Sequence, residues 1–125
     1  MLAEEVVLPE TAWVRLPARL GFEAAATLPC AGVTAYNALF VAAHLRAGDV
    51  VVLQGTGGVS IFGLQLARAA GARAIVTSSS AAKRERALAM GADHVIDYKT
   101  EAEWGNAART WTGGRAALPH SASVL

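Results

Sequence analysis

The sequence predicts an α/β fold, in which a parallel β-sheet is built from alternating strands and helices. Residues 50–53 form a short apolar run without polar alternation, which is typical of a strand that is covered on both faces, and two further strand-like runs follow it. Each run is followed by a segment of helical composition, and the connections between the segments are short. Because parallel strands need a crossover connection, usually a helix, this alternation favours a parallel sheet with right-handed crossovers.

The first elements lie between residues 30 and 70. Residues 30–45 have a broad apolar face at helical spacing, and the Ala47-Gly48-Asp49 sequence ends that segment. Residues 50–53, Val-Val-Val-Leu, predict the first strand. A glycine cluster then leads directly into a predicted helix over residues 59–70, which ends at a further glycine.

The alternation continues through two more strands. Residues 73–77 predict the second strand, and the serines at 78–80 end it and can cap a helix over residues 82–90. Residues 94–98 predict a third short strand, and residues 101–112 predict a further helix. This βαβαβα order is that of the first half of a Rossmann domain, which is a doubly wound parallel sheet.

The two ends of the chain differ from the middle. The first stretch has a strand-like opening at residues 5–8 and prolines at positions 9, 17 and 29, which favour strands and turns over a long helix. The last stretch has no clear period, although a doubly wound sheet is expected to continue there with a fourth strand. We therefore divide the chain into residues 1–29, a partial Rossmann domain over residues 30–114, and a divergent tail over residues 115–125.

Composition and charge exclude several classes of protein. Of the 125 residues, 54% are hydrophobic and 17% are charged, which predicts a folded domain rather than a disordered chain. The net charge of +1 gives no basic footprint for nucleic acid, and no apolar run approaches the roughly 18 residues of a membrane span. One cysteine permits no internal disulfide, and Glu4 and Glu5 stand where a signal peptide is basic. We therefore expect a soluble, cytoplasmic protein that binds neither nucleic acid nor membranes.

The turn after the first strand carries the most informative pattern. Glycines at positions 55, 57 and 58 lie where a dinucleotide-binding turn opens a helix. The first glycine permits the tight turn, the second lets the backbone approach a pyrophosphate, and the helix N-terminus offers N–H groups to it. Ser60 replaces the third glycine of G-x-G-x-x-G, which loosens the match. Glycines also mark ordinary turns, but the flanking strand and helix favour a pyrophosphate site made of Gly55, Thr56, Gly57, Gly58 and Val59.

The end of the second strand indicates which dinucleotide fits. NAD-selective sites place a carboxylate about 20 residues after the first glycine, against the ribose 2′-hydroxyl. Residues 77–84 contain no carboxylate. Ser79, Ser80 and the pair Lys83 and Arg84 instead suit a 2′-phosphate, through charge-assisted hydrogen bonds. The sequence therefore favours NADP(H) over NAD(H); the alternative is that the two cations only form a solvated helix surface.

Three motifs in this order resemble a known family. They are residues 28–36, LPCAGVTAY, residues 54–60, QGTGGVS, and residues 91–98, GADHVIDY. Together they resemble the medium-chain dehydrogenase/reductase superfamily, especially its alcohol dehydrogenase-like and quinone oxidoreductase-like branches. The resemblance covers roughly residues 3–114 and implies that the chain is partial, corresponding to the middle third of a full member.

The resemblance implies roles for several residues. A full member joins a GroES-like catalytic barrel to a Rossmann domain and transfers a hydride in the cleft between them. On this basis residues 1–29 end a GroES-like segment, Thr34 flanks the nicotinamide, Lys83 binds the 2′-phosphate and Tyr98 lies near the adenine ribose. From the residues alone, Thr34 is as readily a residue at a helix N-terminus, and Tyr98 an aromatic side chain in the core.

The resemblance also bears on Cys30, because a cysteine at this position ligates the catalytic zinc in zinc-dependent members of the family. Such a site needs three protein ligands. The partner cysteine and histidine belong to a family segment that would precede Met1, and His44, His94 and His120 match no ligand spacing. We therefore expect no zinc site here and interpret Cys30 as a small core residue.

The favoured function is that of an NADPH-linked oxidoreductase, of the medium-chain alcohol dehydrogenase or quinone reductase type. It would move a hydride to or from a small-molecule carbonyl, alcohol or quinone, and no residue is nominated as acid or base. Two alternatives are a non-catalytic nucleotide-binding remnant and a binding module for another adenine nucleotide. The loss of resemblance after Gly114 suggests a truncated or frameshifted gene as the origin of a remnant. The open edge of residues 50–53 would also permit a homodimer.

Overall fold

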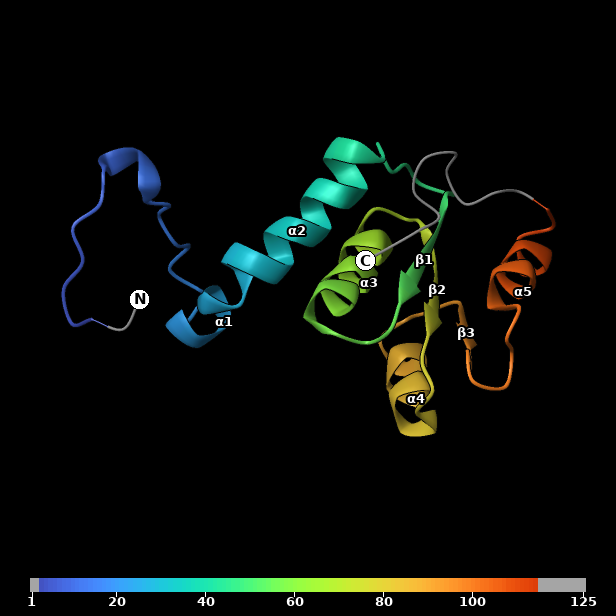
Figure 1. Ribbon diagram of the computed structural model, residues 1–125. Helices are drawn as coiled ribbons and strands as arrows, with labels where there is room; N and C mark the ends of the chain where they lie inside the picture. Colours follow the sequence, from blue (N-terminus) through green and yellow to red (C-terminus); the bar gives the residue numbers. More distant parts are fainter. Residues whose placement is uncertain (1–2, 115–125) are drawn as a thin grey trace.

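The computed structural model describes residues 3–114, whose three strands form one parallel sheet with helices packed around it (Figure 1). The strands are β1 (Val50–Gln54), β2 (Arg73–Thr77) and β3 (His94–Ile96), in the spatial order β1-β2-β3. Register runs from Val50 opposite Arg73 to Gln54 opposite Thr77, and β3 pairs with β2 in the same direction. The predicted α/β fold with a parallel sheet is confirmed.

Two crossover helices and a third helix cover the sheet. Helices α3 (Gly58–Ala69) and α4 (Ala81–Ala89) connect consecutive strands, and α5 (Trp104–Trp111) follows β3. The predicted bounds of α3 and α4 differ from the observed ones by one residue. Helix α5 begins three residues later than predicted, and β3 ends two residues earlier. The early end of β3 has a local cause: the Asp97 carboxylate accepts a hydrogen bond from the Lys99 N–H, which starts a turn instead of extending the strand.

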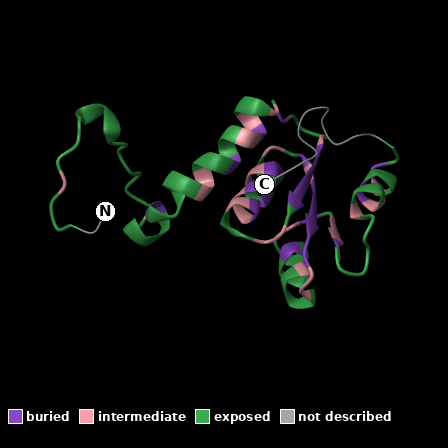
Figure 2. Ribbon diagram, viewed as in Figure 1, coloured by how far each residue is buried: buried purple, intermediate pink, exposed green. Residues whose placement is uncertain are grey.

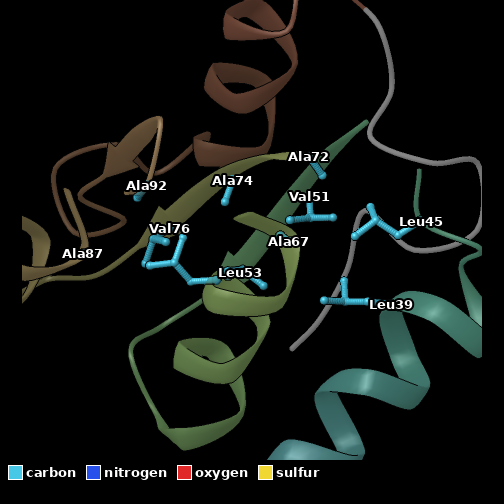
Figure 3. Close-up of a cluster of buried hydrophobic side chains, with 11 residues drawn as sticks. Leu39, Leu45, Val51, Leu53, Ala67, Ala72, Ala74, Val76, Ala87 and Ala92 are labelled. Atoms are coloured by element: carbon cyan, nitrogen blue, oxygen red, sulfur yellow. The ribbon is translucent and has the colours of Figure 1, made fainter. Parts of the chain in front are cut away.

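Alternate side chains of the strands point into two apolar clusters, one on each face of the sheet. Helices α3 and α4 and the helical stretch before β1 cover one face, around Val51, Leu53 and Val76 (Figure 3). Helix α5 covers the other face, where Val50, Val52, Ile75, Ile96 and Ala108 are buried together. All four apolar residues of β1 are therefore buried, as expected for a strand that is covered on both faces.

The segment before β1 is one continuous helical stretch over residues 28–42. It consists of η2 (Leu28–Gly32), α2 (Val33–Tyr36) and η3 (Asn37–Ala42), which follow one another without a break. Gly32 packs against α3, since a Cβ there would lie 3.9 Å from the Phe62 ring. The stretch begins two residues before the predicted start. It ends before His44, which has a left-handed backbone conformation with φ of 52°.

Residues 3–27 form an extended, largely exposed segment (Figure 2). It contains only two short helical turns, η1 (Glu10–Ala12) and α1 (Phe22–Ala26). The predicted strand at residues 5–8 is wrong, since these residues form no β-structure. A strand needs a neighbour that accepts and donates its backbone hydrogen bonds, and no strand lies beside residues 5–8 within residues 3–114.

The predictions on the tail and on membrane spans have different outcomes. The tail over residues 115–125 lies outside the described residues. Within residues 3–114, no helix is both long and apolar enough to cross a lipid bilayer.

Candidate functional site

The glycine turn joins the end of β1 to the start of α3. Gly55 has φ of +85°, a left-handed conformation that glycine adopts without strain. Gly57 is the N-cap of α3 and has an extended backbone, and no side chain caps this helix. Because the helix N-terminus has no side-chain cap, its positive dipole end remains available to an anion. A Cβ placed on Gly55 or Gly57 would meet no protein atom within 4 Å, so the space beside the turn is open.

Two side-chain hydrogen bonds fix this turn to the sheet. The Gly55 N–H donates to the Thr77 Oγ1 at 3.1 Å, which ties the turn to the end of β2. Ser60, at the position of the third glycine, is buried, and its Oγ donates to the Gln54 carbonyl at 3.2 Å. The serine thus takes part in joining α3 to β1. Gly58 marks another close approach, because a Cβ there would lie 3.4 Å from the Cβ of Ala31.

The serine loop after β2 approaches the segment that follows β3. The Tyr98 hydroxyl donates to the Ser79 Oγ at 3.1 Å, so two predicted site residues that are 19 positions apart are in contact. Ser80 accepts a hydrogen bond from the Lys83 N–H at 3.4 Å and caps α4, as predicted. Tyr98 is 45% exposed, which contradicts its interpretation as a core aromatic residue.

Arg84 has a different role from the one its sequence position suggested. Its Nη1 donates to the Asp97 Oδ2 at 2.8 Å and to the Ser78 carbonyl at 2.7 Å. The hydrogen bond from the Lys99 N–H and the nearby Arg84 guanidinium both lower the pKa of Asp97, against an opposing effect of desolvation. Arg84 therefore connects α4 to the end of β3 and does not pair with Lys83 at a phosphate site.

Two cavities in the described part of the chain are lined in part by residues of the glycine turn, and the larger also reaches the last residues of β1 and β2. The larger, about 570 Å³, is lined by Gln54, Gly55, Thr77, Tyr98, Ala102 and Trp104. The smaller, about 240 Å³, lies between α3 and α4 and is lined by Thr56, Ile61, Lys83, Arg86, Ala87 and Met90. The carboxyl ends of the strands are where open parallel sheets bind their ligands.

These cavities bring together some predicted site residues and add others. Gly55 and Tyr98 share the larger cavity, and Thr56 and Lys83 share the smaller one. Sequence reasoning missed Thr77, Trp104 and Arg86. Two of them have positions that could have indicated a role. Thr77 is the last residue of the predicted second strand, and Arg86 lies three residues after Lys83 on the predicted helix.

Thr34 lies apart from both cavities. It is exposed on α2, one helical turn after Ala31, which faces Gly58. The helix thus brings Thr34 to the same end of α3 as the glycine turn. Its expected role beside a nicotinamide stays a prediction.

The described residues do not form a zinc site. Cys30 is exposed, so its interpretation as a core residue is wrong. Leu28, Pro29 and Cys30 are exposed at the start of the helical stretch, whereas the next two residues, Ala31 and Gly32, approach α3. Within residues 3–114, no three side chains of the His, Cys, Asp and Glu type cluster as metal ligands. Cys30 therefore has no partners here for a zinc ion, which needs at least three protein ligands.

The fold and the turn define a class of protein: a parallel sheet whose first glycine-rich turn opens a helix, as in dinucleotide-binding domains. Residues 58–118 match the family model described as zinc-binding dehydrogenase. A zinc-type alcohol dehydrogenase-like protein of Schizosaccharomyces pombe is 46% identical, over 95% of this chain and 38% of that protein. The chain belongs to the medium-chain zinc-binding dehydrogenase superfamily, which includes alcohol dehydrogenases and quinone oxidoreductases.

Solved structures agree with this assignment. A structure assigned as an alcohol dehydrogenase from Sinorhizobium meliloti is 55% identical with a TM-score of 0.83, over 90% of this chain and 33% of that one. The quinone oxidoreductase of Escherichia coli, solved in complex with NADPH, is 33% identical with a TM-score of 0.74, over 81% of this chain and 31% of that one. The chain thus spans about a third of the length of the relatives that it matches.

Proposed function

We propose that this chain forms the cofactor-binding part of an NADPH-linked oxidoreductase of the medium-chain alcohol dehydrogenase or quinone reductase type. The bound nicotinamide would supply the hydride chemistry, with a small carbonyl, alcohol or quinone as the reaction partner. The chain's own residues bind and orient the cofactor. The proposal extends to the cytoplasm as the place of this activity.

The observation that carries this proposal is the open glycine turn at the uncapped start of α3. A diphosphate needs close approach to backbone N–H groups, and side chains at Gly55 or Gly57 would fill the space it requires. We assign the pyrophosphate to the turn formed by Gly55, Thr56, Gly57, Gly58 and Val59. These residues fit the group because they combine an open approach with a positive dipole end.

The serine loop supports NADP(H) over NAD(H). No carboxylate stands in residues 77–84, where a site for a free 2′-hydroxyl requires one. Ser79, Ser80 and Lys83 lie at the start of α4, and Tyr98 is hydrogen-bonded to Ser79. We assign the 2′-phosphate to the first three residues and the adenine ribose to Tyr98.

A fluorescence titration of the 125-residue chain with NADPH and NADH tests this proposal. We expect saturable binding with NADPH preferred. The variant Ser79→Asp places a carboxylate beside the ribose and should shift the preference towards NADH, because the carboxylate repels a 2′-phosphate and accepts from a 2′-hydroxyl. Ser79→Ala is the matched control and should weaken NADPH binding without improving NADH binding. Equal or tighter binding of NADH by the unmodified chain would reject the proposal.

A second candidate function is nucleotide binding without catalysis, which the open glycine turn at the uncapped start of α3 supports equally. Both functions predict NADPH binding, so turnover distinguishes them. NADPH oxidation with a quinone or an aldehyde supports the oxidoreductase. Binding without turnover supports the second function, and preferential binding of ADP or ATP supports a module for another adenine nucleotide.

A further inference from the structure

Helix α4 carries three cationic side chains in two different situations. Arg84 is paired with Asp97 and bonded to the Ser78 carbonyl. Lys83 and Arg86 instead line the cavity of about 240 Å³ between α3 and α4. Within residues 3–114, neither of these two side chains makes an ion pair. Two positive charges therefore lie at one cavity without a negative partner from the described chain.

These two positive charges repel each other across one face of α4. Lys83 and Arg86 are three residues apart, so they are neighbours on one face, and like charges at this spacing destabilise a helix. The floor of the cavity is apolar, formed by Ile61, Ala87 and Met90. An apolar surface gives an anion no hydrogen bonds, so the two cations would be the main source of stabilisation for an anion in this cavity. An anion bound between them would remove the repulsion.

We propose that Arg86 is a specificity-determining residue for NADP(H), which together with Lys83 binds the 2′-phosphate in the cavity between α3 and α4. This inference rests on the proposed function. A phosphate monoester carries a charge of about −1.5 to −2 at pH 7, which matches two cations. The planar guanidinium of Arg86 can donate two parallel hydrogen bonds to it, whereas the Lys83 ammonium acts as a point charge.

The position of the cavity suits this ligand. Thr56, at one side, belongs to the glycine turn assigned to the pyrophosphate. Lys83, at the other side, lies in the first turn of α4, directly after the Ser80 cap. The part of the cavity that Thr56 and Lys83 line therefore lies between the pyrophosphate turn and the first turn of α4, which the serine loop caps. A dinucleotide spans the same two places when its adenosine lies at the ends of β1 and β2.

Binding of two small probes tests this inference. Adenosine 2′,5′-bisphosphate and adenosine 5′-monophosphate differ by the 2′-phosphate, and calorimetry gives the ratio of their dissociation constants. We expect Arg86→Ala to weaken bisphosphate binding about tenfold and to leave monophosphate binding unchanged. Tenfold is at the low end of the effect of a charge-assisted hydrogen bond, because Arg86 is exposed. Arg86→Lys should retain part of the ratio, since it keeps the charge and loses the fork. Arg109→Ala, which removes an exposed arginine from α5, should change neither constant.

Each outcome separates this inference from the proposed function. Equal affinity of the unmodified chain for the two probes rejects the NADPH proposal itself. A preference for the bisphosphate that Lys83→Ala reduces and Arg86→Ala leaves intact overturns the role of Arg86 and keeps the proposed function. Equal weakening of both probes by Arg86→Ala also overturns it, because a helix-stabilising arginine would act on both. Thermal melts of each variant establish folding, and Arg86→Lys provides the comparison if the alanine variant unfolds.

Discussion

At the scale of single residues, Gly55 and Gly57 are glycines for different physical reasons. Gly55 has φ of +85°, where any side chain strains the backbone. Gly57 has φ of −75°, which every residue adopts readily. Neither would place a Cβ within 4 Å of another protein atom. The fold thus requires a glycine at position 55, whereas the open space at position 57 belongs to the proposed ligand.

The variants Gly55→Ala and Gly57→Ala should therefore separate stability from binding. We expect Gly55→Ala to lower the free energy of unfolding by about 1–2 kcal/mol, the usual cost of a left-handed alanine. Gly57→Ala should change this free energy by less than about 1 kcal/mol, because alanine restricts the unfolded chain but is a poorer N-cap than glycine. Its NADPH affinity should nevertheless fall at least tenfold, since the new methyl group occupies the approach of the pyrophosphate.

Urea denaturation and NADPH titration of the same protein samples measure both effects. Ala89→Gly, at the exposed end of α4, is a control for alanine and glycine exchange away from the turn. If Gly57→Ala binds NADPH as tightly as the unmodified chain, the pyrophosphate does not approach this glycine.

The ion pair between Arg84 and Asp97 predicts a pH dependence. The pKa of Asp97 is lowered below its ordinary value of 3.8 by the Lys99 N–H and by Arg84. A depressed carboxylate pKa contributes stability above the unfolded value, and this stability is lost as the pH falls through the folded value. Asp97→Asn should therefore be less stable than the unmodified chain at pH 7, and the difference should shrink below about pH 4.

Unfolding free energies of both proteins at pH 7, 5 and 3 provide the measurement. Glu101→Gln removes a nearby carboxylate for which no ion pair is seen within residues 3–114, and it is the control. A difference between Asp97→Asn and the unmodified chain that stays constant over this range would show that charge at position 97 is not the cause.

Sequence reasoning located the site residues whose requirements are local. The glycine turn follows from the backbone that a tight turn and a phosphate need, and the Ser80 cap follows from its place before a helix. The contact between Gly55 and Thr77 spans 22 residues and depends on the register of β1 and β2. Neither this contact nor the removal of Arg84 from the site by Asp97 could be predicted, because both need the relative position of distant segments.

At the scale of elements, the end of the helical stretch before β1 has a specific strain. His44 adopts φ of 52° where glycine is the usual residue after a helix. The next residue, Leu45, donates its N–H to the Leu39 carbonyl at 2.9 Å and is buried in the core. The left-handed residue thus reverses the chain so that Leu45 can enter the apolar cluster.

His44→Gly should raise the stability of the chain. Relief of the left-handed strain, about 1–2 kcal/mol, exceeds the cost of glycine's freedom in the unfolded chain, so we expect a net gain of roughly 0.5–1 kcal/mol. The midpoint of thermal unfolding should rise by about 4–8 °C for each kcal/mol. His44→Ala is the control and should give no such gain, because alanine keeps the Cβ. A lower midpoint for His44→Gly than for His44→Ala would contradict the assignment of strain.

Elements with a strong local signal were predicted well. Helices α3 and α4 and strand β2 agree with the sequence pattern within one residue, because glycines and serines mark their ends. The strand predicted at residues 5–8 failed, since the apolar composition of a segment does not supply the neighbouring strand that it needs.

At the scale of the whole molecule, the sheet has an unpaired edge. Strand β1 pairs with β2 on one side, and within residues 3–114 no strand lies on its other side. A second apolar surface lies on the N-terminal segment, where Val7, Val14 and Phe22 are 97%, 86% and 85% exposed. Open strand edges and large apolar surfaces both promote association. We propose that the chain forms dimers through the edge of β1.

Sedimentation velocity over a range of protein concentrations should show a monomer that converts to a dimer as concentration rises. The triple variant Val7→Lys, Val14→Lys and Phe22→Lys removes the N-terminal apolar surface and leaves β1 unchanged. We expect it to dimerise like the unmodified chain, because the strand edge persists. A strictly monomeric triple variant would assign the association to the N-terminal segment instead.

The arrangement β1-β2-β3 also has a consequence for how the chain is made. Each strand pairs with the one before it in the sequence, and the bonds that join Gly55 to Thr77 and Ala74 to Asp93 span 22 and 19 residues. Short separations make loop closure inexpensive in entropy and folding fast. Since ribosomes add only about 5–20 residues per second, the first βαβ unit can assemble while the next one is still being synthesised. The phosphate turn, held between β1 and β2, would then be among the earliest parts of the nascent chain to take shape.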